Sequence, residues 1–173
     1  CAGRAEDAQT RTYCWGSNNN GQAGIDAADG TNFASPAPQS PSAPQIVTVA
    51  VGGPRGLGIQ SDGVLVGWGT NAHQSLSVLT DLDMRVEPRF YGSPLDGVWT
   101  DVSTSIWSSY GIRSGVLYVW GWNVEGELGT GGTGMAVRDA VALEGTNWAE
   151  VSAGQRHACG RRTDGSTYCG GRG

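Results

Sequence analysis

The stretch Tyr13-Cys14-Trp15-Gly16-Ser17-Asn18 returns at nearly constant intervals along the chain. Residues 66–71 (VGWGTN) and 118–123 (YVWGWN) are close copies, and residues 168–173 (YCGGRG) are a degenerate fourth. The tryptophans of the first three copies and Gly170 of the fourth are separated by 53, 52 and 50 residues. Self-similarity at such a period is typical of repeat architectures, so the copies are interpreted together.

Composition excludes several classes of partner. The 173 residues include 29 glycines and carry a net charge of −5, and all 11 basic residues are arginine. The one pair of adjacent basic residues, Arg161-Arg162, offers little to a phosphate backbone, so we expect no nucleic-acid partner. There is no run of 18 apolar residues, so we expect no membrane span.

The last copy predicts a β-hairpin with a defined register. Residues 157–162 and 166–169 flank Thr163-Asp164-Gly165, a three-residue loop that ends in glycine, as in a type I turn followed by a left-handed residue. Counting back from this loop places Cys159 directly opposite Cys169. Facing residues in an antiparallel pair lie about 4.5 Å apart at Cα, within the range of a disulfide.

The other copies predict the same hairpin. Ser61-Asp62-Gly63 places Leu57 opposite Gly67, and the shorter loop Ser114-Gly115 places Tyr110 opposite Val119. The first copy runs from Cys1 to Cys14 through a longer polar loop. Four cysteines allow three connectivities, and analogy between the copies favours Cys1–Cys14 with Cys159–Cys169.

A further strand is expected before each hairpin. Residues 46–52, 99–103 and 148–152 alternate apolar with small or polar residues, as half-buried strands do. The connectors that follow the tryptophan-glycine pairs vary in length, and the first, 25–44, contains four prolines and is expected to be irregular or polyproline-like. No helical period is evident.

The pattern Trp-x-x-Val-Ser-x-Gly, His-x-Cys and Asp-Gly-x-x-Tyr-Cys-Trp-Gly-x-Asn resembles the repeat of the regulator of chromosome condensation family. This resemblance implies an all-β fold, a partial β-propeller of about three to three and a half four-stranded antiparallel blades. The paired cysteines are similar to those of the secreted or cell-surface bacterial branch, which implies an extracytoplasmic location. A lipid-modified Cys1 stays open as an alternative.

The resemblance divides the chain into a partial blade (1–24), a proline-rich connector (25–44), two blades with their connectors (45–97 and 98–147) and a partial blade (148–173). Three and a third repeats leave open faces, which soluble proteins avoid. We therefore expect a segment of a longer propeller, with further blades of the same chain closing it, or partner chains in an oligomer as the alternative.

Structural roles follow for the recurring residues. The large tryptophans are expected to fill the space between blades, the glycines after them to let backbones pass closely, and the asparagines to bond their own backbone in turns. Trp99 and Trp148 open the strands before two hairpins. The recurring sets are Trp15, Gly16 and Asn18; Trp68, Gly69 and Asn71; and Trp120, Gly121 and Asn123.

Candidate chemistry is sparse. Residues 129–134 contain G-x-G-x-x-G, which we interpret as a turn of the repeat because no helix is predicted after it. His157, Cys159 and Cys169 are three possible zinc ligands without an obvious fourth, and a disulfide is favoured. Acidic residues form no catalytic pair and are interpreted as solvated loop charge: Asp26, Asp29, Asp81, Asp83, Glu125 and Glu127. We expect no catalytic, metal or cofactor site.

The sequence therefore favours a non-enzymatic protein-binding or scaffold module. Loops on a rigid scaffold carry most binding residues, and one connector combines arginine with aromatics, as binding hot spots do. Its candidate partner contacts are Arg85, Arg89, Phe90 and Tyr91. Family analogy alone gives the alternative of a regulatory propeller, either an exchange factor for a small GTPase or an enzyme inhibitor such as those of β-lactamase.

Overall fold

The computed structural model describes residues 1–6, 9–25, 31–39, 45–76, 91–92, 97–134 and 136–172. Their strands are β1 (Ala2–Glu6), β2 (Gln9–Gly16), β3 (Phe33–Pro38), β4 (Ile46–Gly52), β5 (Arg55–Gln60), β6 (Leu65–Gly69), β7 (Tyr91–Gly92), β8 (Trp99–Thr104), β9 (Ser108–Arg113), β10 (Val116–Gly121), β11 (Val137–Ala142), β12 (Trp148–Ala153), β13 (His157–Arg162) and β14 (Thr167–Gly171). Within these residues the helical structure is one 3₁₀ turn, η1 (Ala72–Gln74).

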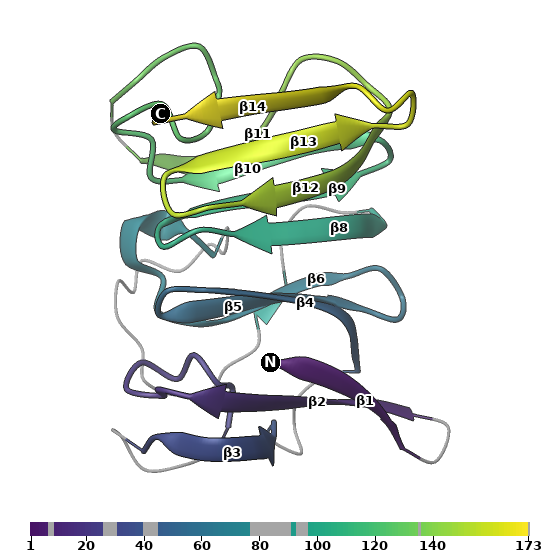
Figure 1. The fold of residues 1–173 in the computed structure, drawn as a ribbon, viewed down its shortest axis with the longest axis vertical. Coiled ribbons are helices and arrows are strands. Elements are labelled where there is room, and N and C mark those ends of the chain that lie inside the picture. The colour runs from purple at the N-terminus through teal and green to yellow at the C-terminus, as the bar shows by residue number, and fades with distance from the viewer. Residues whose placement is uncertain are drawn as a thin grey trace.

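The strands form four antiparallel sheets that follow the order of the chain. Sheet I is β1-β2-β3, sheet II is β4-β5-β6-β7, sheet III is β8-β9-β10-β11 and sheet IV is β12-β13-β14. The sheets stack face to face from the N-terminal to the C-terminal end (Figure 1). This arrangement of successive small antiparallel sheets confirms the expected all-β partial propeller.

Burial follows the position of each sheet in the stack. In sheet II, β6 is buried along its whole length and β5 nearly so, because neighbouring sheets cover both faces. In sheet IV, every residue of β14 is exposed. A strand with two covered faces needs small or apolar side chains on both, and the sequence GLGI of β5 meets this requirement.

The predicted hairpin registers are confirmed. Leu57 faces Gly67, Tyr110 faces Val119 and Cys159 faces Cys169. Gly63 and Gly165 end their three-residue loops at φ of 84° and 88°, and the two-residue loop has Ser114 and Gly115 at 51° and 73°. Turn chemistry within a few residues was therefore sufficient to set the pairing.

Both expected disulfides are present, one in each terminal sheet. The Cα atoms of Cys1 and Cys14 lie 4.0 Å apart, and those of Cys159 and Cys169 lie 4.1 Å apart. Each bond joins two neighbouring strands of one hairpin. The first hairpin differs from expectation in its loop, because β1 and β2 stay paired as far as Glu6 and Gln9 instead of ending in a longer polar loop.

The first strands of sheets II, III and IV lie next to one another. Between β8 and β12 the contact is polar: Asp101 Oδ2 accepts a hydrogen bond from the Val151 amide at 2.8 Å, and Ser103 Oγ accepts one from the Ala153 amide at 3.0 Å. Burial raises the pKa of the Asp101 carboxyl, an effect that its two backbone hydrogen bonds oppose. Successive sheets are therefore joined by directional bonds as well as by apolar packing.

Two tryptophans fill the interfaces between sheets. Trp68 and Trp120 are fully buried. The indole of Trp68 donates a hydrogen bond to the Gln22 carbonyl at 3.0 Å, and that of Trp120 donates one to the Ser75 carbonyl at 2.9 Å. Each tryptophan thus reaches back from its own sheet to the turn that follows the preceding copy of the repeat.

The asparagine of each copy holds the turn that follows it, and in the first two copies this turn receives the indole. Ala23, Leu76 and Leu128 each donate their amide hydrogen to the side-chain oxygen of the asparagine five residues earlier, at 2.9 to 3.0 Å. These asparagines are Asn18, Asn71 and Asn123. Backbone bonding by the asparagines, expected from the sequence, is therefore observed in all three copies.

The glycine after each of the two buried tryptophans is required by backbone geometry. Gly69 and Gly121 have φ of 87° and 98°, in the left-handed region. A Cβ on either would also collide with a main-chain carbonyl, that of Pro54 or Trp107. The backbone can turn at these positions only with glycine.

Trp15 does not fill an interface as expected, since 48% of its surface is exposed. Trp68 and Trp120 are covered by the preceding sheet, whereas no described sheet lies before sheet I. The connector 25–44 also differs from expectation, because β3 occupies part of it and pairs with β2. Proline is tolerated there because Pro36 lies in a β-bulge and β3 is an edge strand.

Because Trp15 is exposed and Trp120 is buried, we expect their substitution by alanine to lower the stability of the protein by very different amounts. We expect Trp120→Ala to lower the free energy of unfolding by about 3–5 kcal/mol, because it empties a closed interface and removes a hydrogen bond. Trp15→Ala should cost less than about 1 kcal/mol. Urea unfolding of the oxidised variants measures both, and equal losses would show that the interface tryptophans do not hold the stack together.

Candidate functional site

A cluster of three aromatic rings lies at the end of the sheets opposite the hairpin loops. The His73 ring packs edge-on against Trp107 and Trp122, with centroids 5.0 and 4.4 Å away. All three side chains are half-buried. They belong to η1, to the β8–β9 turn and to the turn after β10, so three turns from two sheets meet here. We call this cluster the aromatic surface.

Main-chain bonds fix the two tryptophans. The Trp122 amide donates to the Trp107 carbonyl at 3.0 Å, and the Ser108 hydroxyl donates to the Trp122 carbonyl at 2.7 Å. Ser105 Oγ accepts hydrogen bonds from the amides of Trp107 and Ser108. His73 has φ of 58°, an uncommon conformation for a residue with a side chain, and this turns its ring toward the tryptophans.

A buried arginine supports the turn from below. Arg55, on β5, is fully buried. Its guanidinium donates hydrogen bonds to the carbonyls of Ile106 and Ser108. Burial lowers the pKa of Arg55 to about 9, which leaves the group protonated at neutral pH. Sheet II thus positions the turn of sheet III that carries Trp107.

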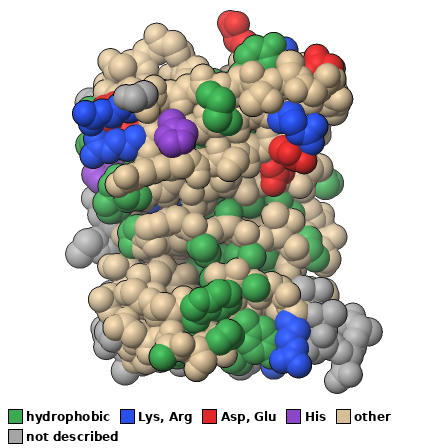
Figure 2. Space-filling model, viewed as in Figure 1, with side chains coloured by type: hydrophobic (Ala, Val, Ile, Leu, Met, Phe, Trp, Pro, Cys, Tyr) green, Lys and Arg blue, Asp and Glu red, His purple; other side chains and the backbone are tan. Residues whose placement is uncertain are grey.

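Charged groups border the aromatic surface. Glu125 Oε1 lies 2.7 Å from Nη1 of Arg156 and 3.0 Å from Nη1 of Arg172. The hydrogen bond from Arg156 holds the pKa of the Glu125 carboxyl below its ordinary value. Figure 2 shows basic and acidic side chains next to one another over the C-terminal sheets. A hollow of about 190 Å³ separates this ion pair from the rings.

The sequence suggested that the acidic residues are solvated loop charges, and this interpretation is wrong for Glu125 and Glu127. Glu125 bridges two arginines, and Glu127 is 3% exposed with its Oε2 accepting a hydrogen bond from the Glu125 amide at 2.8 Å. The reason is the turn after Asn123, which folds back and brings both carboxylates against the protein. The other acidic residues of that set, Asp26, Asp29, Asp81 and Asp83, lie outside the described residues.

The chemistry of the surface suits binding. Tryptophan and arginine are enriched in the centres of protein interfaces. Within the described ranges, no group of three or more His, Cys, Asp and Glu side chains could hold a metal ion. The two cysteines considered as zinc ligands with His157 form a disulfide. Among the same residues, no helix is long and apolar enough to cross a membrane.

The structure places the remaining sequence candidates as follows. Trp99 and Trp148 are buried, each with an arginine, Arg113 or Arg162, stacked over its ring at 5.5 and 4.8 Å. Residues 129–134 form a glycine-rich turn closed by the Gly134 amide, which donates to the Asn123 carbonyl. The proposed contacts Arg85, Arg89 and Phe90 lie outside the described residues, and Tyr91 is described only as part of β7.

The aromatic surface was missed from the sequence, although a signal existed. Trp107 and Trp122 occupy turn positions at which the other copies have no aromatic residue. The counterparts of Trp122 are Ser17, Thr70 and Arg172, and those of Trp107 are Pro54 and Arg156. Two large rings that the repeat does not require could have been recognised by aligning the copies.

The fold and its recurring contacts define an array of β-propeller blades. Residues 114–160 match the Regulator of chromosome condensation (RCC1) repeat. The Ultraviolet-B receptor UVR8 of Arabidopsis thaliana is 31% identical over 162 residues, covering 89% of this chain and 35% of that protein. The chain thus carries RCC1-like repeats, and it spans about a third of this relative's length.

Solved structures agree on the fold. Human WBSCR16 superposes with a TM-score of 0.77 at 19% identity, over 96% of this chain and 44% of that one. Yeast RCC1 (Prp20), solved with Kap60 bound to it, superposes with a TM-score of 0.75 at 21% identity, over 93% and 39%. At these identities the likeness concerns the arrangement of the blades.

Arg55 offers a test of how the aromatic surface is supported. We expect Arg55→Met to lower the free energy of unfolding by at least about 2 kcal/mol, because it removes the guanidinium donor from the Ile106 carbonyl and one of the donors from the Ser108 carbonyl. Chemical unfolding measures this loss, and the fluorescence maximum of the tryptophans should shift as the turn loosens. An unchanged stability would contradict a supporting role.

Glu125 gives a pH-dependent prediction. Its pKa in the folded protein should lie below 4.5, the ordinary value. Because the folded pKa is the lower one, the stabilisation is present above the unfolded pKa and is lost as the pH falls through the folded one. NMR titration of the carboxyl measures the midpoint. Arg156→Gln should raise it, and Arg161→Gln, which removes the partner of Glu150 instead, should leave it unchanged.

Proposed function

We propose that the chain is a non-enzymatic protein-binding module that acts in an oxidising, extracytoplasmic compartment. The observation that carries this proposal is the aromatic surface of His73, Trp107 and Trp122. Three half-buried rings that the repeat does not require lie together at the end of sheets II and III opposite the hairpin loops, beside the Glu125–Arg156 ion pair. Apolar rings bordered by charges match the composition of a protein interface.

Rigidity of the surface supports this function. The backbones of Trp107 and Trp122 are bonded to each other, and Arg55 anchors the turn from the neighbouring sheet. A surface held in its binding conformation loses little conformational entropy when a partner docks. Large aromatic side chains on such a frame contribute most of the binding energy in many complexes.

The disulfides support the proposal of an oxidising, extracytoplasmic compartment. All four cysteines of the chain are paired, and such bonds persist mainly in secreted, periplasmic or surface proteins. Both bonds sit in the outermost sheets of the stack, where one face lacks a described neighbour. There they restrain hairpins that receive the least packing from other sheets.

Relatives with this fold support protein binding as its use. Yeast RCC1 (Prp20) has been solved bound to Kap60, and Prp20p has been studied for its binding to Gsp1p and histones. All of these partners are proteins. In our proposal the present chain shares the mode of use, a rigid propeller face against a protein, and not these particular partners. Further blades or partner chains would cover the face on which Trp15 is exposed.

A capture experiment tests the proposal. The oxidised chain is immobilised and exposed to extracellular and envelope fractions of its native source, and retained proteins are identified by mass spectrometry. We expect one identified protein to bind the unaltered chain and to bind at least ten-fold more weakly to the Trp107→Ala, Trp122→Ala double variant, since hot-spot tryptophans each contribute about 2 kcal/mol or more.

Val64→Ala is the control, because Val64 is an exposed apolar residue at the hairpin end of sheet II, opposite to the aromatic surface. It should retain the same protein, and the difference should be reproduced with the purified partner. Equal retention by the double variant would place binding elsewhere. Absence of any specific partner in these fractions would contradict the proposed function.

A further inference from the structure

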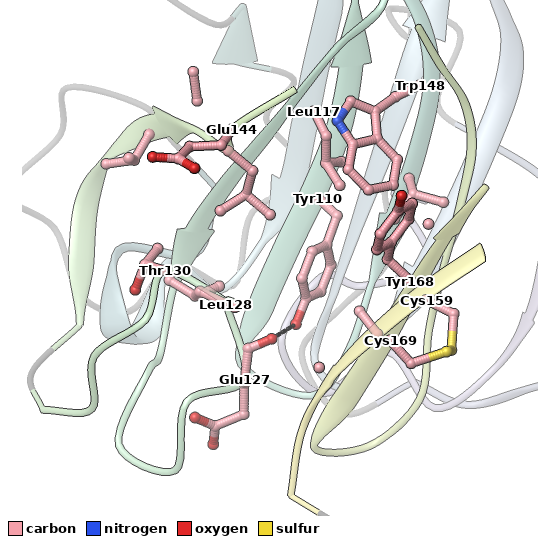
Figure 3. A pocket seen from close by; sticks show the side chains of 18 of the residues that line it. Tyr110, Leu117, Glu127, Leu128, Thr130, Glu144, Trp148, Cys159, Tyr168 and Cys169 are labelled. Carbon is pink, nitrogen blue, oxygen red and sulfur yellow. Dashed lines mark hydrogen bonds between the residues drawn. A yellow bond between two sulfur atoms is a disulfide. The ribbon is translucent and has the colours of Figure 1, made fainter. Parts of the chain in front are cut away.

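A pocket of about 640 Å³ opens between sheets III and IV. Its volume lies within the range of small-ligand sites. One wall is formed by Tyr110 and Leu117 of sheet III with Leu128 of the turn after β10, and the other by Trp148 and Tyr168 of sheet IV (Figure 3). The Cys159–Cys169 disulfide lies at its edge.

The pocket occupies the place of a missing tryptophan. Gly170 of β14 stands where β6 has Trp68 and β10 has Trp120, as the strand registers show: Gly56 faces Trp68, Ser109 faces Trp120 and Ala158 faces Gly170. A Cβ added to Gly170 would meet a single neighbour, the Cα of Gly129, at 3.6 Å. The space that an indole fills in the two other interfaces is open in this one.

The acceptor for an indole N–H is also in place. Trp68 and Trp120 donate to the carbonyls of Gln22 and Ser75, each four residues after the asparagine of the preceding copy. The residue four after Asn123 is Glu127, whose carbonyl borders the pocket. Its position in the turn is the same, because Asn123 bonds the Leu128 amide as the other asparagines bond theirs.

This carbonyl can accept a second donor. The Tyr110 hydroxyl already donates to it at 2.7 Å, and burial raises the pKa of that hydroxyl, which keeps it protonated. The Ser75 carbonyl shows that two donors are compatible, since it accepts from both Ser109 Oγ and the Trp120 indole. A carbonyl oxygen has two lone pairs for this purpose.

The aromatic wall of the pocket is also preserved. In the preceding interface, the Trp99 ring packs edge-on against Trp120 with centroids 6.1 Å apart, and against Tyr118 at 5.6 Å. In the pocket, Trp148 packs against Tyr168 in the same way, at 5.6 Å. The edge contact that Trp99 makes with Trp120 has no counterpart for Trp148, because residue 170 is glycine.

We propose that the pocket beside Gly170 binds the indole side chain of a tryptophan carried by a protein partner. The indole would donate its N–H to the Glu127 carbonyl and lie against Trp148. In the same way, the Trp120 indole donates to the Ser75 carbonyl and lies against Trp99. This inference rests on the proposed function, which supplies a protein partner, and it names the chemical group by which that partner is recognised.

The test uses N-acetyl-tryptophanamide as a probe, so it does not depend on finding the partner. Calorimetric titration of the oxidised chain should give saturable binding at one site, and amide shifts in NMR spectra should map to residues 127–129 and 168–170. N-acetyl-leucinamide should bind at least about five-fold more weakly. The 1-methyl-indole analogue, which lacks the N–H, should also bind several-fold more weakly because one hydrogen bond is lost.

Gly170→Trp should fill the pocket, abolish binding of the probe and raise the melting temperature. Gly170 is not in the left-handed region, so its backbone accepts a side chain. Thr167→Trp is the matched control: it adds the same side chain to β14 on the opposite face, outside the pocket lining, and should leave probe affinity unchanged. Gly170→Leu, a smaller addition, should weaken binding at least ten-fold if the tryptophan variant does not fold.

The proposal is overturned if the unaltered chain shows no saturable binding, or if both Gly170 variants bind the probe as well as the unaltered chain does. Equal affinity for the tryptophan and leucine probes would also overturn it, by showing an unselective apolar hollow. These outcomes leave the capture experiment on the aromatic surface unaffected, so failure of this inference is distinguishable from failure of the proposed function.

Discussion

Two of the three interfaces in the stack depend on the same hydrogen bond. A buried indole donates to a carbonyl in the turn that follows the preceding copy, and an asparagine four residues earlier holds that turn. The bond requires a large flat side chain and a glycine after it at positive φ. These requirements explain why the tryptophan and glycine recur while the connectors vary.

Polar groups inside the stack follow from the same geometry. Sheets that lie face to face leave turn carbonyls under their neighbours, and such groups need donors. Arg55 supplies them to the turn of sheet III, and the Asp101 and Ser103 side chains accept the amide hydrogens of sheet IV. Where the repeat lacks its tryptophan, at Gly170, the molecule has a pocket between two sheets.

Sequence reasoning succeeded where a feature depends on neighbours within one hairpin. Loop length and glycine position set the registers, the register of the last hairpin placed Cys159 opposite Cys169, and analogy between the copies gave Cys1–Cys14. It was wrong for Trp15 and for the connector that contains β3. Burial of Trp15 depends on a preceding sheet, and β3 forms because β2 has an open edge on that side, not because of its own proline-rich composition.

The sequence by itself determined the order of the sheets, their hairpins, their disulfides and the tryptophans that fill two of the interfaces, because these features follow from local turn chemistry and a nearly constant period. Only the tertiary structure decided what meets across sheets. It brought His73 to Trp107 and Trp122, placed Arg55 beneath their turn, buried Glu127 and opened the pocket at Gly170. Contacts between residues tens of positions apart depend on how whole sheets are stacked, and local propensities do not contain that information.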